Sequence, residues 1–210
     1  MNVVRAWELT ESGEAVLVDV RDQSKFGLGH PRCALNLPFS LRGLEERLGM
    51  LLQPGTSVVL ITENSEQAEA ALPQFQEGAF NVLGVVEGGI DAWQESDLPW
   101  EVLRELSVHD ISGAAADGNT VIVDVRESIE WDMGHVPDAI LISLGELRER
   151  IDEIPREQRV AVICEAGVRS SSAASILQAA GFPDVVNVPE GTGGYRNAGL
   201  PLETPDQERS

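Results

Sequence analysis

Residues 17–22 read Leu-Val-Asp-Val-Arg-Asp, and residues 122–127, 105 positions later, read Ile-Val-Asp-Val-Arg-Glu. In both copies a short apolar run ends in Asp-Val-Arg, and an apolar, β-branched run of this length is typical of a buried strand. The Gly-His pair at 29–30 returns at 134–135, again 105 positions later. Motifs that recur in the same order indicate an internal duplication.

The second half of each repeat matches at a slightly shorter offset. Its counterparts lie 102 positions apart, which fits a loop deletion of three residues. The matching segments are 58–62 with 160–164, Trp93 with Tyr195, and the Leu-Pro pairs 98–99 with 200–201. The 210 residues therefore predict two homologous domains, residues 1–103 and 104–210, that meet near residues 100 to 106.

Each repeat has the same expected order of elements. A helix-like segment opens each repeat, in the regions of 10–12 and 107–110, and charged amphipathic helices follow over Leu41 to Leu52 and Leu144 to Ile151. The predicted strands include 34–38, 58–62 and 82–86, with counterparts at 139–143, 160–164 and 185–188. Strands that alternate with helices form an α/β fold, a parallel sheet with helices on both faces, and its ligands bind beyond the carboxyl ends of the strands.

The composition excludes several classes of function. Lys+Arg 15 against Asp+Glu 35 gives a net charge of −20, shared equally between the halves, which argues against binding to nucleic acid or to anionic membranes. No apolar run could span a membrane and no leader is visible, so we expect a cytoplasmic protein. Two cysteines are too few for a disulfide framework, and the scattered His and Cys predict no metal and no cofactor. Cys33 is either a resolving thiol or, more simply, a loop cysteine without function.

The stretch from 164 to 171 reads Cys-Glu-Ala-Gly-Val-Arg-Ser-Ser. It follows the predicted strand and precedes a helix expected to begin near Arg169 or Ser170. A tight loop that leads into a helix directs successive backbone N–H groups inward, and the helix N-terminus adds unpaired N–H groups and a positive dipole end. A cysteine in this position is favoured as the nucleophilic thiolate.

Two further residues of the loop support this interpretation. Gly167 can adopt backbone angles that are closed to other residues, and Arg169 carries a fixed charge that can hold an anion with two parallel bonds. Cys164 is therefore interpreted as a nucleophile that carries or attacks an anionic group. The alternative is a small buried hydrophobic residue, the usual role of a cysteine in an α/β domain.

With these motifs the sequence resembles the tandem rhodanese-domain proteins, which are sulfurtransferases of the thiosulfate sulfurtransferase type. Each repeat has the Asp-Val-Arg strand end, the Gly-His turn, and a closing Gly-rich turn followed by an aromatic residue and Leu-Pro. The second repeat adds Cys-x-x-Gly-x-Arg-Ser at 164–170. The resemblance implies two domains, each with a five-stranded parallel sheet flanked by helices.

The resemblance also implies a ping-pong reaction. Cys164 would take a sulfane sulfur from thiosulfate or a persulfide, become a persulfide, and pass the sulfur to cyanide or a thiol. The loop backbone would cradle the sulfur, and its residues are Glu165, Ala166, Gly167, Val168, Arg169 and Ser170. The expected partners are a small sulfur-containing anion or thiol and a sulfur-accepting protein.

The length and charge of the loop narrow the expected substrate. Cysteine phosphatases place five residues between cysteine and arginine, whereas four residues, 165–168, lie there in this chain, which suits a small sulfur better than a tetrahedral phosphate. Family members that favour thiosulfate often carry basic residues in this loop, where this chain has Glu165. Because Glu165 would offset Arg169 in a protein of charge −20, we expect weak thiosulfate turnover and a preference for a neutral, thiol-borne or protein-borne donor.

The corresponding loop of the first domain lacks this chemistry. Thr62 replaces the cysteine, Ser65 the glycine and Gln67 the arginine, and no base is in evidence to activate the threonine hydroxyl. The first domain is therefore predicted to be degenerate and non-catalytic, and the second to be catalytic.

Asp124, Arg126 and His135 are expected to support the site mainly as scaffold, because the first domain keeps the same residue types without a nucleophile. The Gly-rich segment 190–194 lacks a phosphate-binding fingerprint and is interpreted as a tight turn close to the cysteine loop.

A second interpretation uses the same cysteine differently. In a non-enzymatic sulfur-binding or redox-sensing module, Cys164 would be oxidised or sulfurated as a signal. The two interpretations differ in turnover, because a sensor transfers at most one equivalent of sulfur.

Overall fold

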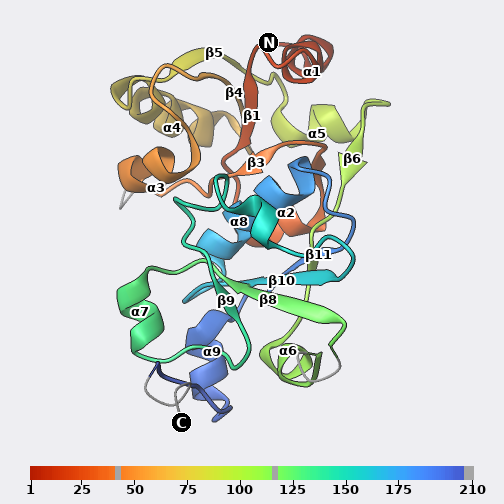
Figure 1. Ribbon diagram of the computed structural model, residues 1–210. Helices are drawn as coiled ribbons and strands as arrows, with labels where there is room; N and C mark the ends of the chain where they lie inside the picture. The colour runs from red at the N-terminus through yellow and green to blue at the C-terminus, as the bar shows by residue number, and fades with distance from the viewer. Residues whose placement is uncertain (41–43, 115–117, 206–210) are drawn as a thin grey trace. The chain divides into compact units, whose positions relative to one another are not determined.

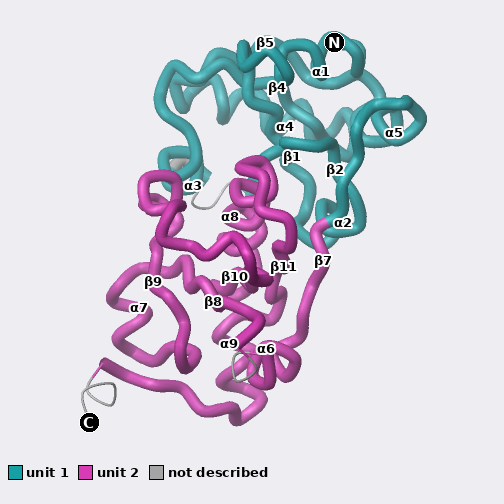
Figure 2. The backbone as a smooth tube through the Cα atoms, turned by 45° about the vertical axis from the view of Figure 1, so that its right-hand side comes forward, with its two compact units in different colours: residues 1–102 teal, residues 103–210 magenta. Residues whose placement is uncertain are grey.

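The computed structural model describes residues 1–40, 44–114 and 118–205 and divides the chain into two compact units, Met1–Val102 and Leu103–Ser210 (Figures 1 and 2). This division lies one residue before the predicted one. Among the described residues, no helix combines the length and the apolar character that a membrane span requires.

The main sheet of unit 1 has four parallel strands in the order β3–β1–β4–β5. Its strands are β1 (Val16–Asp19), β3 (Leu35–Asn36), β4 (Ser57–Ile61) and β5 (Asn81–Val85), and a small antiparallel pair consists of β2 (His30–Pro31) and β6 (Trp100–Glu101). The helices are α1 (Val3–Glu11), α2 (Gln23–Leu28), α3 (Leu44–Leu51), α4 (Ser65–Glu77) and α5 (Gly89–Gln94).

The prediction of five strands is wrong for this unit as far as the structure describes it. At the open edge of β5, Met1 is the only described residue that makes strand-like backbone hydrogen bonds. Its N–H group donates to Val85 at 2.8 Å, and its carbonyl accepts from Glu87 at 2.8 Å. A single paired residue is too short to count as a fifth strand.

Unit 2 has the predicted five-stranded parallel sheet, in the order β7–β11–β10–β8–β9. The strands are β7 (Arg104–Glu105), β8 (Thr120–Asp124), β9 (Ile140–Leu141), β10 (Arg159–Ile163) and β11 (Val185–Asn187). The helices are α6 (Val108–Ala114), α7 (Ser128–Asp132), α8 (Val168–Ala179) and α9 (Gly191–Asn197), with a short 3-10 helix at Ile151–Glu153. Figure 1 shows α8 on one face of this sheet and α6 with α9 on the other, so helices cover both faces as expected.

The amphipathic segments were predicted less accurately. Residues 144–150 form turns and a bend instead of a helix, and Ile151 begins the short 3-10 helix. Bonds such as Glu146 N–H to Ser143 and Glu149 N–H to Glu146 span three residues. Gly145 weakens the helical alternative, because glycine costs about 1 kcal/mol in a helix interior. In unit 1 the helix is confirmed over Leu44–Leu51, and residues 41–43 of that prediction lie outside the described residues.

The register of two central strands positions the functional residues. β8 and β10 pair in parallel, with Asp124 opposite Ile163, so the residues that follow both strands emerge together at one edge of the sheet. Their β-branched side chains are buried between the helices, with Val123, Val162 and Ile163 fully inaccessible to solvent.

Candidate active site

The cysteine loop joins β10 to α8. Cys164 directly follows the strand, Glu165 and Ala166 form the loop, and Gly167 is the N-cap of a helix whose first residue is Val168. The predicted loop residues are therefore contiguous, and the helix begins slightly earlier than expected. Residues 168–170 belong to its first turn.

Six consecutive backbone N–H groups at this position have no acceptor. Within the part of the chain that the structure describes, the N–H groups of residues 165–170 donate to no carbonyl or side-chain oxygen, and the first is Ser171, which donates to Gly167 at 3.2 Å. Three of these groups belong to the first turn of a helix, where the helix dipole also favours negative charge. This is the composition of an anion-binding loop.

Two glycines allow the loop to pack closely against its neighbours. Gly167 has φ +79, and a Cβ atom there would lie 2.4 Å from the carbonyl oxygen of Pro189. Gly191 has φ +62, and its Cβ would lie 2.4 Å from the carbonyl oxygens of Cys164 and Glu165. Any other residue at either position would displace the cysteine loop.

The Cys164 thiol is buried, with 2% of the residue exposed. Its surroundings are nevertheless polar on one side, because Sγ lies 3.4 Å from Oγ of Ser170 in a hydrogen bond. Together with the unpaired N–H groups of the loop, this contact distinguishes Cys164 from a cysteine that only fills an apolar core.

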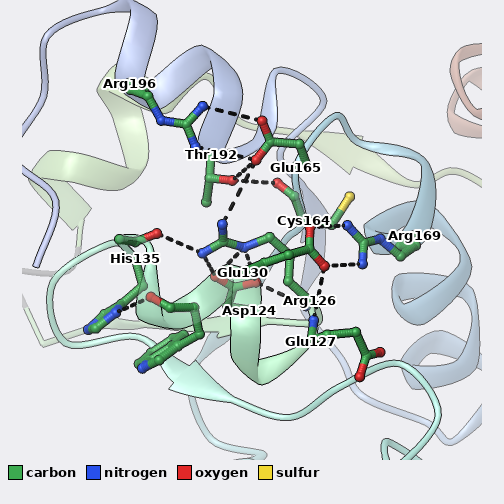
Figure 3. A network of polar contacts seen from close by, with 12 residues as sticks. Asp124, Arg126, Glu127, Glu130, His135, Cys164, Glu165, Arg169, Thr192 and Arg196 are labelled. Carbon is green, nitrogen blue, oxygen red and sulfur yellow. Dashed lines mark hydrogen bonds and ion pairs between the residues drawn. The ribbon is translucent and has the colours of Figure 1, made fainter. Parts of the chain in front are cut away.

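Arg169 does not present a free guanidinium. Its Nη1 and Nη2 donate to the two carboxylate oxygens of Glu130 on α7, at 2.6 and 2.7 Å (Figure 3). The hydrogen bond with Glu130, reinforced by the charges of Glu130 and Cys164, raises the pKa of Arg169, and the same bond lowers the pKa of Glu130. The expected bidentate partner is therefore present inside the protein, and a bound anion would have to compete with it.

Glu165 does not offset Arg169, which corrects the expected electrostatic role. Its carboxylate accepts a hydrogen bond from Thr192 at 2.8 Å and pairs with Arg196 at 3.3 Å and with Arg126 at 3.8 Å. Burial acts to raise the pKa of Glu165, but the bonds from Thr192 and Arg196 and the charge of Arg126 outweigh it and lower the pKa. The loop is thereby fastened to α9 and to the segment after β8.

Asp124 and Arg126 form a buried pair beneath the loop. The Nη2 of Arg126 lies 2.7 Å from Asp124 and donates to the carbonyl of Gly134 at 3.0 Å. Unit 1 repeats the arrangement with Asp19 and Arg21, at 2.6 Å. Since the same pair occurs beside a loop without a cysteine, its contacts are those of a scaffold.

His135 also has structural contacts. Its ring stacks on Trp131 with centroids 3.6 Å apart, and its Nδ1 lies 3.2 Å from the Trp131 carbonyl. In Figure 3 the ring points away from the Cys164 sulfur. His30 stacks on Phe26 in the same way in unit 1, at 3.7 Å.

The corresponding loop of unit 1 is closed by its own side chains. Asn64 caps α4 by accepting from the Gln67 N–H group at 2.9 Å, and the Gln67 side chain accepts from the Glu63 N–H group at 2.8 Å. These bonds satisfy N–H groups that stay unpaired in unit 2. Thr62, the counterpart of Cys164, is buried.

Other predicted features have simpler surroundings. Residues 191–194 form the first turn of α9 rather than a separate turn, and they are close to the loop as predicted, because Thr192 N–H donates to the Cys164 carbonyl at 2.8 Å.

Cys33 lies in unit 1 with φ +65, and burial together with the charge of Glu101 raises its pKa. No cluster of metal-binding side chains occurs in residues 1–40, 44–114 and 118–205.

Sequence reasoning missed Glu130 and Thr192. Glu130 forms a capping box with Glu127, but glutamate is not one of the usual N-cap residues, so the Glu-x-x-Glu spacing was not a clear helix-start signal. No signal indicated that its carboxylate reaches Arg169, 39 positions later, or that the Thr192 hydroxyl reaches Glu165. The Asn-x-x-Gln spacing of 64–67 is a helix-start signal, but it did not indicate that these side chains would close the loop of unit 1.

The fold and the site define a tandem α/β protein in which the cysteine loop of the second domain has a run of unpaired backbone N–H groups. The Rhodanese-like domain family matches residues 3–96 and 107–198. The chain therefore belongs to the rhodanese-like domain family and contains two of its domains.

Individual proteins resemble parts of the chain. A protein named "Sulfurtransferase" from Allochromatium vinosum is 30% identical over 106 residues, which is 50% of this chain and 99% of that protein. A protein from Bacillus subtilis is 37% identical over 76 residues, 36% of this chain and 41% of its own length. A crystal structure of thiosulfate sulfurtransferase from Pseudomonas aeruginosa is 24% identical, with a TM-score of 0.45 over 90% of this chain and 40% of that one.

Proposed function

We propose that the protein is a sulfurtransferase that moves a sulfane sulfur through a Cys164 persulfide in its second domain. The observation that carries this proposal is the run of unpaired N–H groups at 165–170 beside a cysteine at the end of β10. Such a run stabilises a thiolate and the terminal sulfur of a persulfide, since both are anions. The name of the Allochromatium vinosum relative supports the same reaction class.

The reaction takes two displacement steps. The Cys164 thiolate attacks the outer sulfur of the donor, a new S–S bond forms at Cys164, and the donor's own bond to that sulfur breaks. The leaving group is sulfite when the donor is thiosulfate, and a thiolate when the donor is a persulfide. An acceptor thiolate or cyanide then attacks the outer sulfur of the persulfide, which breaks the S–S bond and returns the Cys164 thiolate, so no external oxidant or reductant is needed.

The charge around the loop favours a donor less anionic than thiosulfate. Each cation near the loop is paired with a carboxylate: Arg169 with Glu130, Arg126 with Asp124, and Arg196 with Glu165. The formal charges of these pairs cancel, so a dianion gains little local attraction and meets a protein of charge −20. A thiol-borne or protein-borne persulfide avoids this penalty.

The carrier step is tested by intact-mass measurement after incubation with a sulfane donor. Wild-type protein is expected to gain one sulfur, about 32 Da, that reducing agent removes. The Cys33→Ser variant should gain the same mass, because Cys33 lies in the other unit, outside the loop. A gain that persists in Cys164→Ser would exclude the proposed carrier.

Turnover separates an enzyme from a sensing module. With excess donor and cyanide, an enzyme forms thiocyanate well beyond one equivalent per Cys164, whereas a sensor stops at one. Formation of a single equivalent would contradict the catalytic part of the proposal and leave only sulfur binding.

A further inference from the structure

Unit 1 contains a cavity of about 560 Å³ beside its closed loop. This volume is in the range of small-molecule sites. Every residue that lines it belongs to residues 1–102: Arg21, Lys25, Leu28, Gly29, Glu63, Asn64, Ile90, Asp91, Gln94 and Trp100.

Arg21 brings to this cavity a buried guanidinium that is paired with Asp19 and has one nitrogen without a partner. The residue is only 5% exposed. Its Nε and Nη2 bond to Asp19, and Nη2 also donates to the Gly29 carbonyl. Among the described residues nothing accepts from Nη1 or forms an ion pair with it, so Nη1 is the nitrogen of Arg21 that is left for a ligand.

The duplicated unit shows what this nitrogen can accommodate. In unit 2 the Nη1 of Arg126 has a carboxylate beside it, with Oε2 of Glu165 at 3.8 Å. Its counterpart in unit 1, Glu63, is paired instead with Lys25, the single lysine of the chain. Lys25 therefore holds the internal carboxylate away from Arg21.

We propose that the cavity of unit 1 binds a small monocarboxylate with an apolar body. The ligand carboxylate would pair with Arg21 Nη1, in the role that Glu165 has toward Arg126, and the side-chain amide of Gln94 is available as a second donor. Leu28, Ile90 and Trp100 supply the apolar wall, and Leu28 is 83% exposed at present. This site makes no use of Cys164.

The charge of the cavity limits the ligand to one negative charge. Glu63 and Asp91 belong to its wall, and the charge of Arg21 is already balanced by Asp19. A phosphate or a dicarboxylate would bring a second anionic group against these carboxylates, whereas a single carboxylate can be matched by Nη1 alone.

The test uses 3-phenylpropionate as the probe, 3-phenylpropanamide as its neutral isostere, and inorganic phosphate as the multiply charged anion. Each compound is titrated into the full-length protein, and binding is followed by calorimetry and by NMR of the tryptophan indole signals. We expect 3-phenylpropionate to bind in the millimolar range that its size permits and the amide to bind about tenfold more weakly. Phosphate should not bind detectably. Equal binding of acid and amide, or no binding of the acid at about 10 mM, would overturn the proposal.

A variant that copies unit 2 gives an independent test. Lys25→Glu, Ile90→Thr and Gln94→Arg together reproduce Glu130, Thr192 and Arg196, a set that the duplicated fold already tolerates. Glu63 should then turn to Arg21 and weaken 3-phenylpropionate binding at least about tenfold. The single Lys25→Gln variant should weaken it in the same direction, and Arg5→Gln, an exposed cation outside the cavity, should leave it unchanged. Unaltered binding in Lys25→Gln, with the fold intact by circular dichroism, would count against the proposal even if the triple variant fails to fold.

Discussion

At the scale of single residues, the decisive contact is between Arg169 and Glu130. Both terminal nitrogens of the planar Arg169 guanidinium bond to the Glu130 carboxylate. Glu130 therefore has two effects. It holds Arg169 in place, and it cancels the positive charge that an anionic donor would otherwise meet.

The Glu130→Gln variant should improve the use of anionic donors. Without the carboxylate, the charge of Arg169 is exposed to the loop, so we expect KM for thiosulfate to fall about threefold or more, with a smaller fall for the singly charged methanethiosulfonate. Glu153→Gln is a matched control, because Glu153 also holds an arginine, Arg150, with two bonds but lies outside the loop. A KM for thiosulfate that is the same in Glu130→Gln and wild type would refute this role of Glu130.

The same contact predicts a dependence of stability on pH. The hydrogen bond from Arg169, against the effect of burial, lowers the pKa of Glu130 below its ordinary value of 4.5. A lowered carboxylate pKa stabilises the folded state fully above the unfolded value, and the contribution is lost as pH falls through the folded value. Urea unfolding should show wild type more stable than Glu130→Gln by about 1 kcal/mol at neutral pH, and the difference should shrink as the pH falls below 4.5. A difference that grows on acidification would contradict this assignment.

At the scale of elements, the junction between β10 and α8 depends on a backbone that only glycine adopts without strain. Gly167 has φ +79 and faces the Pro189 carbonyl, whereas Gly181, just after α8, has φ +82 and open space around its Cβ position. The two positions share the same backbone cost and differ in the steric clash.

These two glycines provide a matched pair of variants. Gly181→Ala should destabilise the protein by about 1 kcal/mol, the cost of a positive φ for alanine. Gly167→Ala should cost about 2 kcal/mol more, because the 2.4 Å contact forces the loop to move, and it should also abolish sulfur loading of Cys164. Both values come from urea unfolding, and equal losses in the two variants would show that the clash is relieved without cost.

The elements differ in how far their structure depends on contacts between residues that are distant in the sequence. The β-branched run of β10 and the Cys-x-x-Gly-x-Arg loop are specified by adjacent residues, so sequence alone predicted both. Residues 144–151 have an amphipathic pattern of apolar residues that fits a series of turns as well as a helix. The spacing of the apolar residues alone was therefore ambiguous. The partner of Arg169 was not predictable, because Glu130 lies 39 positions away and the contact depends on the parallel pairing of β8 with β10.

At the scale of the whole molecule, the strongly negative net charge of the chain contrasts with the balanced charges at the cysteine loop. The chain carries −20, and each half contributes equally. Because the pairs at the loop cancel locally, the long-range field governs how fast an anion approaches and the loop governs how it binds. These two effects can be separated experimentally, since salt screens the long-range field over roughly 10 Å but leaves the buried contacts largely intact.

Donor loading should therefore accelerate with ionic strength, in proportion to the charge of the donor. For thiosulfate we expect the second-order rate of Cys164 sulfuration to rise about two- to fivefold between low salt and about 0.3 M, because screening removes the repulsion between a dianion and the acidic protein. Methanethiosulfonate carries one charge. The logarithm of its loading rate should therefore rise with ionic strength at about half the slope found for thiosulfate. Stopped-flow loading monitored by mass, at constant pH and in a salt with an inert anion, gives both slopes. Rates that fall with salt would mean that a local positive field at the loop outweighs the charge of the whole protein, and equal slopes for the two donors would contradict the proposed dependence on donor charge.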